Sequence, residues 1–348
     1  MLKIENLDLK NKRKCNITFI IGNGFDIGLG MKTKYENMYD DYINSQSKST
    51  VIENFKKALS KRKPYDKWSD FEMGMAQYAS KFTNENELIE CIRDFKMHLL
   101  EHLRDEYKKI ADQLMVVYYR QYLIQELDRS LYKFHKGLIP NDIRTVERII
   151  NNLDIDHNFI TFNYTNTLET LLLIKRLYTK VSHNAPIHIH GSLDQDIVLG
   201  IDNICQISHA AYTLTNKGER AFVKPSFNNQ YDSERVEKAK TIIANSDIIC
   251  TYGFSFGESD NTWIQNINHW LLEDNNHHLI VYEYDDKNYN RCNSDELMDI
   301  EEDKKYVFLN KMSVPINVLL EQIHIPIYYD IFDFKDIINS PKPKATSL

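Results

Sequence analysis

The sequence predicts an α/β protein built on a Rossmann-like parallel sheet, with a large all-helical insertion after the first strand. Three observations predict this class in the 348-residue chain. A β-branched run near the N-terminus ends in a glycine turn, a long stretch after it carries only helical periodicity, and the second half alternates short apolar runs with amphipathic segments. This alternation is typical of a parallel sheet with helices on both faces.

The first strand is predicted at residues 16–21, where NITFII precedes Gly22. No convincing strand pattern follows between residues 34 and 150. Shorter helical patterns cover residues 53–61 and 66–78. Apolar residues three or four positions apart then predict one face of a long helix, formed by Ile92, Phe95, Leu99, Leu103, Tyr107, Ile110, Leu114 and Val117.

After residue 150 the pattern changes to alternating strands and helices. Strands are predicted at residues 157–163, 187–190, 247–252 and 279–284, and helices at 167–178, 233–245 and 260–272. The predicted domains are therefore a Rossmann-like nucleotide-binding domain (residues 1–33 and 151–340), a helical insertion (34–150) and a disordered tail (341–348).

Composition excludes several classes. The hydrophobic fraction of 42% and the charged fraction of 27% are those of a globular protein with a sizeable core. The net charge of −7 does not favour a nucleic-acid or anionic-membrane surface. No run approaches the ~18 apolar residues of a spanning helix, and the N-terminus lacks the features of a secretory signal. Five widely spaced cysteines without a CxxC motif argue against a zinc ribbon or a disulfide framework. We expect a cytoplasmic protein.

The turn Gly22-Asn23-Gly24 lies between a strand and a predicted helix. Glycines there allow a tight turn and close approach of a ligand, and N–H groups at a helix start favour a phosphate. The full GxGxxG fingerprint is absent because Ile27 occupies its third glycine position. Asp26 would repel a pyrophosphate, although it could cap the helix or contact a ribose hydroxyl. A plain strand-to-helix turn explains the same residues.

Two further motifs end predicted strands. Asn163, in TFNYT, can orient a water or a sugar hydroxyl, or can satisfy the backbone of its own turn. His190, in HIHGS, can act as a general base near neutral pH, and His188 is predicted to share its face of the strand. A paired-histidine metal site and a structural histidine are the alternatives. Because no acidic or cysteine partner is evident nearby, we predict no metal.

Two other matches are weaker. HLLEH at residues 98–102 fits a zinc-binding pattern, but Leu99 and Leu103 lie on the apolar helical stripe, which favours packing. Gly253-Phe254-Ser255-Phe256-Gly257 matches the nucleophile elbow of serine hydrolases, with Asp285 and His324 downstream in acid-then-histidine order. The other interpretation of this turn is a phosphate cradle with the Ser255 hydroxyl as a donor.

Taken in sequence order, four segments resemble the AbiH family of bacterial phage abortive-infection proteins: FIIGNGFDIGLGMKTKYENMY, FNYTNTLE, HIHGSL and YGFSFGESD. The same positions resemble the sirtuin-like NAD-binding fold more distantly. The matching positions are Gly22, Gly24, Gly30, Met31, Thr161, Asn163, His190, Gly191, Gly253 and Ser255.

The chain departs from the sirtuin pattern at three positions. Asp26 stands where sirtuins have a serine, Tyr35 where they have an arginine, and Thr165 where they have an acid. The zinc ribbon of deacylating sirtuins is also absent, which argues against protein deacylation.

The resemblance implies an anti-phage protein that hydrolyses NAD or a related nucleotide at its N-glycosidic bond. It implies that the ligand is held by Gly22, Asn23, Gly24, Asp26, Gly253 and Ser255. Asn163 would then position the water or the ribose, and His190 would act as the base. The resemblance further implies that NAD is the substrate and that no cofactor is required.

The expected partners are the nucleotide, a phage-derived trigger and a second copy of the chain, with no membrane and no nucleic acid. Two other functions stay open. One is a serine hydrolase that uses Ser255, and the other is a non-catalytic nucleotide sensor that signals through the helical block.

Overall fold

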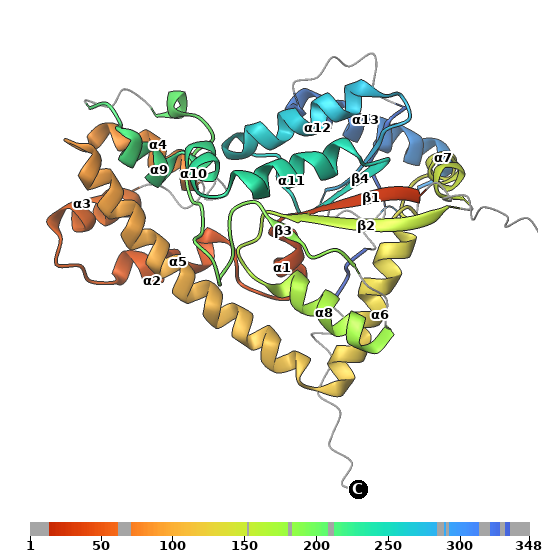
Figure 1. Cartoon of the computed structure of the whole chain (residues 1–348), viewed down its shortest axis with the longest axis horizontal. Coiled ribbons are helices and arrows are strands. Elements are labelled where there is room, and N and C mark those ends of the chain that lie inside the picture. The colour runs from red at the N-terminus through yellow and green to blue at the C-terminus, as the bar shows by residue number, and fades with distance from the viewer. Residues whose placement is uncertain are drawn as a thin grey trace, which may run out of the picture.

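The computed structural model describes residues 14–61, 71–151, 153–179, 183–207, 212–283, 289, 292–312, 321–327 and 331–334. Its centre is one parallel sheet of six strands in the order β3-β2-β1-β4-β5-β6 (Figure 1). The strands are β1 Lys14–Ile21, β2 Asp154–Thr161, β3 Ile187–His188, β4 Ile248–Tyr252, β5 His278–Tyr282 and β6 Ile323–His324. The predicted α/β class with a parallel sheet is therefore confirmed.

The strand order is that of Rossmann folds, with the direction of winding reversed between β1 and β4. At that point the connections leave to opposite sides, which opens a crevice beyond the carboxyl ends of the two strands. Phe19 of β1 lies level with Phe159 of β2 and Cys250 of β4. The ends of these strands are therefore nearly aligned, and the loops that follow them meet at one edge of the sheet.

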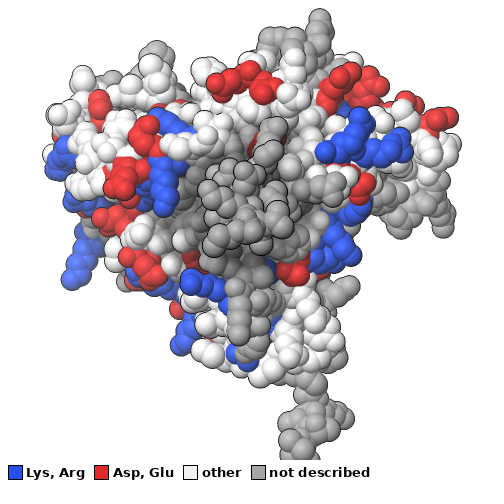
Figure 2. Space-filling view, turned by 45° about the vertical axis from the view of Figure 1, so that its right-hand side comes forward, with Lys and Arg blue, Asp and Glu red and all other residues white. Residues whose placement is uncertain are grey.

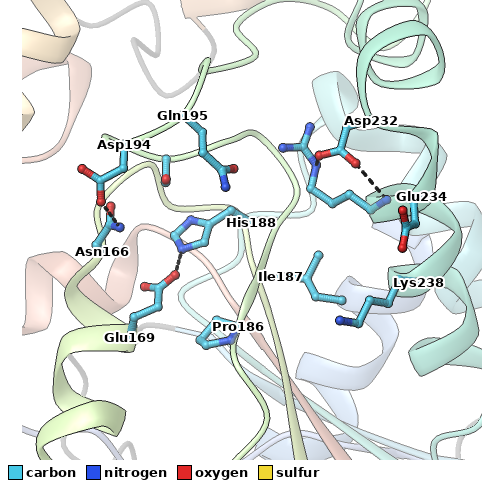
Figure 3. Close-up of a pocket in the computed structure, with 12 residues that line it drawn as sticks. Asn166, Glu169, Pro186, Ile187, His188, Asp194, Gln195, Asp232, Glu234 and Lys238 are labelled. Carbon is cyan, nitrogen blue, oxygen red and sulfur yellow. Dashed lines mark hydrogen bonds and ion pairs between the residues drawn. The ribbon is translucent and has the colours of Figure 1, made fainter.

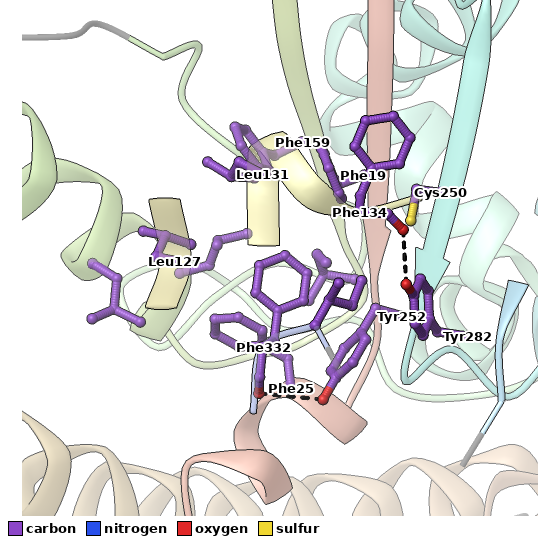
Figure 4. Close-up of a cluster of buried hydrophobic side chains, with 14 of the residues drawn as sticks. Phe19, Phe25, Leu127, Leu131, Phe134, Phe159, Cys250, Tyr252, Tyr282 and Phe332 are labelled. Carbon is purple, nitrogen blue, oxygen red and sulfur yellow. Dashed lines mark hydrogen bonds between the residues drawn. The ribbon is translucent and has the colours of Figure 1, made fainter. Parts of the chain in front are cut away.

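One face of the sheet is covered by α1 (Gly24–Gly28), α6 (Val117–Lys133), α7 (Pro140–Ile150) and α8 (Thr167–Thr179). Alternate residues of each strand point into this layer, as strand geometry requires. Figure 4 shows its aromatic centre, where the rings of Phe19 and Phe159 stack with centroids 5.7 Å apart. The Tyr282 hydroxyl donates to the Phe134 carbonyl at 2.7 Å, which joins β5 to the end of α6.

The opposite face is covered by α11 (Ser233–Ala244), α12 (Asn261–Glu273) and α13 (Ser294–Met312). Ile20 and Ile249 point into this second layer, whereas the residues immediately before and after each of them point into the first layer. Strands β4 and β5 are therefore buried on both sides along their whole length, which explains why IICTY and HLIVY are almost continuous apolar runs in the sequence.

A helical block stands beside the sheet, on the left of Figure 1. It contains α2 (Tyr35–Asn44), α3 (Thr50–Ser60), α4 (Phe71–Tyr78) and the first part of α5 (Glu85–Leu114). Its core also includes apolar residues from segment 193–223, which contains α9 (Asn216–Phe222). The short helix α10 (Lys224–Tyr231) follows directly. In the described part of residues 34–150 all regular elements are helical, as predicted.

The long helix ends earlier than the sequence pattern predicts. Helix α5 stops at Leu114, and Val117 begins α6 with 53% of its surface exposed. No glycine or proline marks this break, and the apolar spacing continues across it. The sequence pattern therefore gives no sign that the helix ends at Leu114. In the second half, β2 ends at Thr161 and β3 at His188, which leaves Asn163 and His190 in loops. Gly191, with φ of +74°, turns the chain away from the sheet there.

Other predictions fall partly outside the described residues. Helix 66–78 is described only from Phe71 onwards, and strand 279–284 is described through Tyr282 as β5. The tail 341–348 lies outside the described residues. The division into domains at residues 33 and 150 stays a prediction. Within the part that the structure describes, no helix is long and apolar enough to cross a membrane.

Candidate ligand site at the carboxyl edge of the sheet

The loops after β1 and β4 lie against each other at the switch point of the sheet. The Gly22 N–H donates to the Tyr252 carbonyl at 2.9 Å, and the Gly24 N–H donates to the Gly253 carbonyl at 3.2 Å. The glycine turn and the GFSFG turn are thus one structural unit, although more than 200 residues of sequence separate them.

The glycines are required by this contact. A Cβ atom on Gly22 would lie 2.4 Å from the Gly253 carbonyl oxygen, and one on Gly24 would lie 2.5 Å from the Gly253 Cα. Gly253 itself has φ of +65°. The N–H groups of Gly22 and Gly24 are therefore used between the two turns rather than presented to a phosphate. A role for these glycines in ligand binding stays a prediction.

Asn23 is exposed between the two glycines, and its side chain is bonded to Thr33. The Asn23 Oδ1 accepts from the Thr33 hydroxyl at 2.5 Å, and its Nδ2 donates to the Thr33 carbonyl at 3.2 Å. The side chain thus braces the loop that leads toward the helical block.

Asp26 is almost completely buried inside α1. Its Oδ2 accepts from the Thr165 hydroxyl at 2.5 Å, which joins the glycine turn to the loop after β2. Burial raises the pKa of Asp26 to about 6, against the opposing effect of hydrogen bonds from Thr165, Thr167 and Asn163. The suggestion that Asp26 caps the helix is wrong, because Asn23 occupies the cap position and Asp26 is directed toward Thr165.

Asn163 lies in the loop two residues beyond β2 and is 5% exposed. Its N–H donates to the Thr161 hydroxyl at 3.1 Å, and its carbonyl accepts from His188 Nδ1 at 2.9 Å. Its side-chain Oδ1 is buried without a hydrogen-bond partner among the described residues. A buried acceptor of this kind normally has a partner, so it is suited to a water or a ligand hydroxyl.

His190 is buried in the turn after β3. Its Nε2 lies 2.9 Å from Asp260 Oδ1, which is an ion-pair distance without hydrogen-bond geometry. Its ring meets Phe162 edge-on at a centroid distance of 5.2 Å, and Phe162 packs against Phe254 at 4.4 Å. These aromatic contacts, with the Asp26–Thr165 bond, bring all four sequence motifs together at one edge of the sheet.

The prediction that His188 and His190 share a face is wrong, because His190 lies beyond the end of β3. The side chain of His188 bonds Glu169 instead of pointing to the partners of His190. His188 Nδ1 lies 2.9 Å from the Asn163 carbonyl oxygen, and its Nε2 contacts the Glu169 carboxylate.

Asp260 is a site residue that the sequence analysis did not single out. Its Oδ1 contacts both His190 Nε2 and, at 3.0 Å, the ammonium of Lys224. Burial opposes ionisation, but Lys224 and His190 hold the pKa of Asp260 well below its usual range. The only sequence signal for Asp260 was its position at the end of the segment YGFSFGESD.

A cavity of about 400 Å³ opens beside β3, between α8 and α11 (Figure 3). One wall carries the His188–Glu169 pair and the Asn166–Asp194 hydrogen bond of 2.8 Å. The other wall carries cationic residues of α11, including Lys238. Asn163 and His190 do not line this cavity, but the cavity adjoins Asn163 through its hydrogen bond with His188.

The geometry at Ser255 differs from that of a nucleophile elbow. Ser255 is exposed, but the residues with positive φ in this turn are Gly253 and Phe256. A 3₁₀ turn, η4 (Glu258–Asp260), separates Ser255 from α12, whereas an elbow leads directly into its helix.

The predicted triad partners of Ser255 are not assembled around it in the described structure. His324 on β6 bonds Asp142 at 2.7 Å through Nδ1 and His278 at 2.9 Å through Nε2. Asp285 lies outside the described residues. Across the part of the chain that the structure describes, no group of three His, Cys, Asp or Glu side chains is placed to hold a metal ion.

Basic and acidic side chains are interspersed on the described surface of the face in Figure 2. This mixed pattern agrees with the modest net charge of −7.

A six-stranded parallel sheet in this order, with polar side chains gathered at its carboxyl edge, defines a Rossmann-like α/β protein with a candidate ligand site at the switch point. Residues 18–284 match the family described as bacteriophage abortive infection AbiH. The chain therefore belongs to the AbiH family and has a role in phage abortive infection. No curated protein matches the chain.

Proposed function

We propose that the chain hydrolyses NAD, or a related nucleotide, at the N-glycosidic bond during phage infection. The observation that carries the proposal is Asn163, which is buried at this edge of the sheet and whose Oδ1 has no hydrogen-bond partner among the described residues. Its loop contacts all three of the other motif loops, through Asp26, His190 and Phe254. Ligands of open α/β sheets bind at this edge.

The pairing of Asp26 with Thr165 also supports the proposal. These are two of the positions at which the chain departs from the sirtuin pattern, which has a hydroxyl at the first and an acid at the second. In this chain the carboxylate and the hydroxyl have exchanged positions, and a 2.5 Å hydrogen bond joins them. The two departures therefore compensate each other, which supports a nucleotide site of sirtuin type.

The proposed reaction needs little covalent machinery. The bond between the ribose C1′ and the nicotinamide nitrogen breaks, and its electron pair leaves with nicotinamide. A water oxygen then bonds to C1′, and the water loses one proton. Asn163 Oδ1 would orient the water or a ribose hydroxyl. His190 would take the proton at Nδ1, since its Nε2 faces Asp260.

The test is nicotinamide release from NAD by purified protein, followed by chromatography. Asn163→Ala and His190→Ala should each lower the rate by about 100-fold or more, as expected for loss of an orienting group or a base. Two matched controls should retain activity once folding is verified. Asn158→Ala changes an asparagine on β2, the strand that leads to Asn163, and His157→Ala changes another buried histidine. Full activity in both site variants would overturn the assignment.

Two other outcomes separate the alternatives. Thermal stabilisation by NAD or ADP-ribose without turnover would favour a nucleotide sensor. Labelling of the wild type, but not of Ser255→Ala, by a fluorophosphonate probe would favour a serine hydrolase.

A further inference from the structure

A continuous chain of contacts between buried acidic and basic side chains runs from the helical block to His190. Glu72, on α4, has Oε1 3.2 Å from the Lys224 ammonium. Lys224 Nζ lies 3.0 Å from Asp260 Oδ1, and the same oxygen lies 2.9 Å from His190 Nε2. Glu72, Lys224 and His190 are each less than 8% exposed. The four residues come from four segments that are far apart in the sequence.

Lys224 is the central link of this chain. Its ammonium group has three donors, and it has three acceptors within reach: Glu72, Asp260 and, at 3.1 Å, the Ser259 carbonyl. Burial lowers the pKa of Lys224, but Asp260 and Glu72 outweigh this effect and raise it. Moving the ammonium away would leave two buried carboxylates without a counter-charge, which is costly. The position of Asp260 therefore depends on Glu72 through Lys224.

Neighbouring residues keep this series of charged side chains in place. Tyr35 and Tyr164 face Glu72 and Asp260, and burial raises the pKa of both phenols well above the ordinary value, so they remain neutral. Asp202 accepts from the N–H and the hydroxyl of Thr262 at 3.1 and 3.0 Å, which fixes the start of α12 directly after Asp260.

We propose that Asp260 is a positioning residue for His190, and that Glu72 of the helical block completes the site through Lys224. The helical block is then part of the site rather than a separate module. The role of His190 as the base rests on the proposed function, whereas the link from Glu72 to His190 is a property of the folded protein and is tested without any substrate.

The first test is NMR of the His190 ring nitrogens in the full-length protein, labelled with ¹⁵N-histidine and assigned with His190→Gln. Asp260→Asn removes the partner's charge and should shift the Nε2 signal. Glu72→Gln, which does not contact His190, should also shift it, through Lys224. The matched control is Glu106→Gln, which changes another buried glutamate, on α5, that bonds Lys32 and Lys109 instead. It should leave the His190 signals unchanged.

Unchanged His190 signals in folded Glu72→Gln protein would overturn the proposal, as would equal shifts in Glu72→Gln and Glu106→Gln. If Asp260→Asn does not fold, Glu72→Gln alone still decides the question. A second arm measures nicotinamide release, which Glu72→Gln should lower on the order of tenfold by decreasing kcat with little change in KM. If the wild type releases no nicotinamide, the proposed function fails, while the NMR result still supports or overturns the link.

Discussion

Asp26 is a carboxylic acid enclosed at the edge of the sheet, where the cost of burial exceeds the benefit of its hydrogen bonds. Its pKa is therefore raised to about 6. An unfolded chain would release the same proton near the ordinary value of 3.8. Between these two pH values the folded protein binds more protons than the unfolded chain. The free energy of unfolding therefore falls as the pH rises through this window, and the loss is complete above about pH 6.

Asp26→Asn should remove this loss. An asparagine keeps an oxygen that accepts from Thr165, but it carries no charge to desolvate. We expect the variant to be more stable than the wild type at pH 7 by up to about 3 kcal/mol and equally stable near pH 3.5. Urea unfolding across this pH range measures the difference. A variant less stable than the wild type at pH 7 would contradict the assigned cause of the pKa shift.

Residues of the candidate site could be singled out from the sequence where a motif marked them, as for Asn163 and His190, and their roles stay predictions. Glu72, Lys224 and Asp260 could not be predicted as a group, because their ion pairs join segments that only the fold brings together. A lone buried lysine has no local sequence signature that distinguishes it from an exposed one.

At the scale of elements, the turns after β1 and β4 form a backbone contact that only glycine permits. The sequence leaves two explanations for these glycines, a ligand-binding turn and a plain strand-to-helix turn. The structure supplies a further reason for them, which is the close approach of two loops. This reason could not be predicted, because the second loop lies beyond the entire helical block in the sequence.

A comparison of Gly22→Ala with Gly28→Ala distinguishes the loss of this loop contact from the general effect of replacing a glycine. A Cβ on Gly22 would overlap the Gly253 backbone, whereas a Cβ on Gly28 would meet its nearest neighbour at 3.5 Å. We expect Gly22→Ala to destabilise the protein by about 3 kcal/mol. Gly28→Ala should change stability by less than about 1 kcal/mol. Thermal unfolding of both variants measures this, and equal stability would show that the two turns do not pack this tightly.

The main strands and the helices between them were predictable because long apolar runs and amphipathic periods are strong local signals. The errors of the sequence prediction have local causes. Helix α5 ends without a glycine or proline, and β6, which was not predicted, has only two residues, Ile323 and His324. A strand this short is defined by its pairing with β5 and not by its own sequence.

At the scale of the whole molecule, the helical block and the sheet are joined by core residues and by ion pairs. Segment 193–223, which connects β3 to β4, supplies apolar residues to the core of the helical block. The charge chain from Glu72 to His190 crosses the same junction.

We therefore expect the block and the sheet to unfold in one cooperative transition. In a Trp68→Phe variant, fluorescence reports on Trp263 and Trp270, which are packed on the sheet, while far-UV circular dichroism reports on all helices. The two probes should give coincident urea curves. A separate earlier transition in circular dichroism alone would mean that the block unfolds independently.

The most direct test of the central claim is the NAD content of phage-infected bacteria that express the protein. We predict that NAD falls after infection in cells with the wild type, together with release of nicotinamide. NAD should stay at its starting level in cells with equal amounts of folded Asn163→Ala or His190→Ala protein. Protection from phage with unchanged NAD in wild-type cells would contradict the proposal that NAD is the substrate.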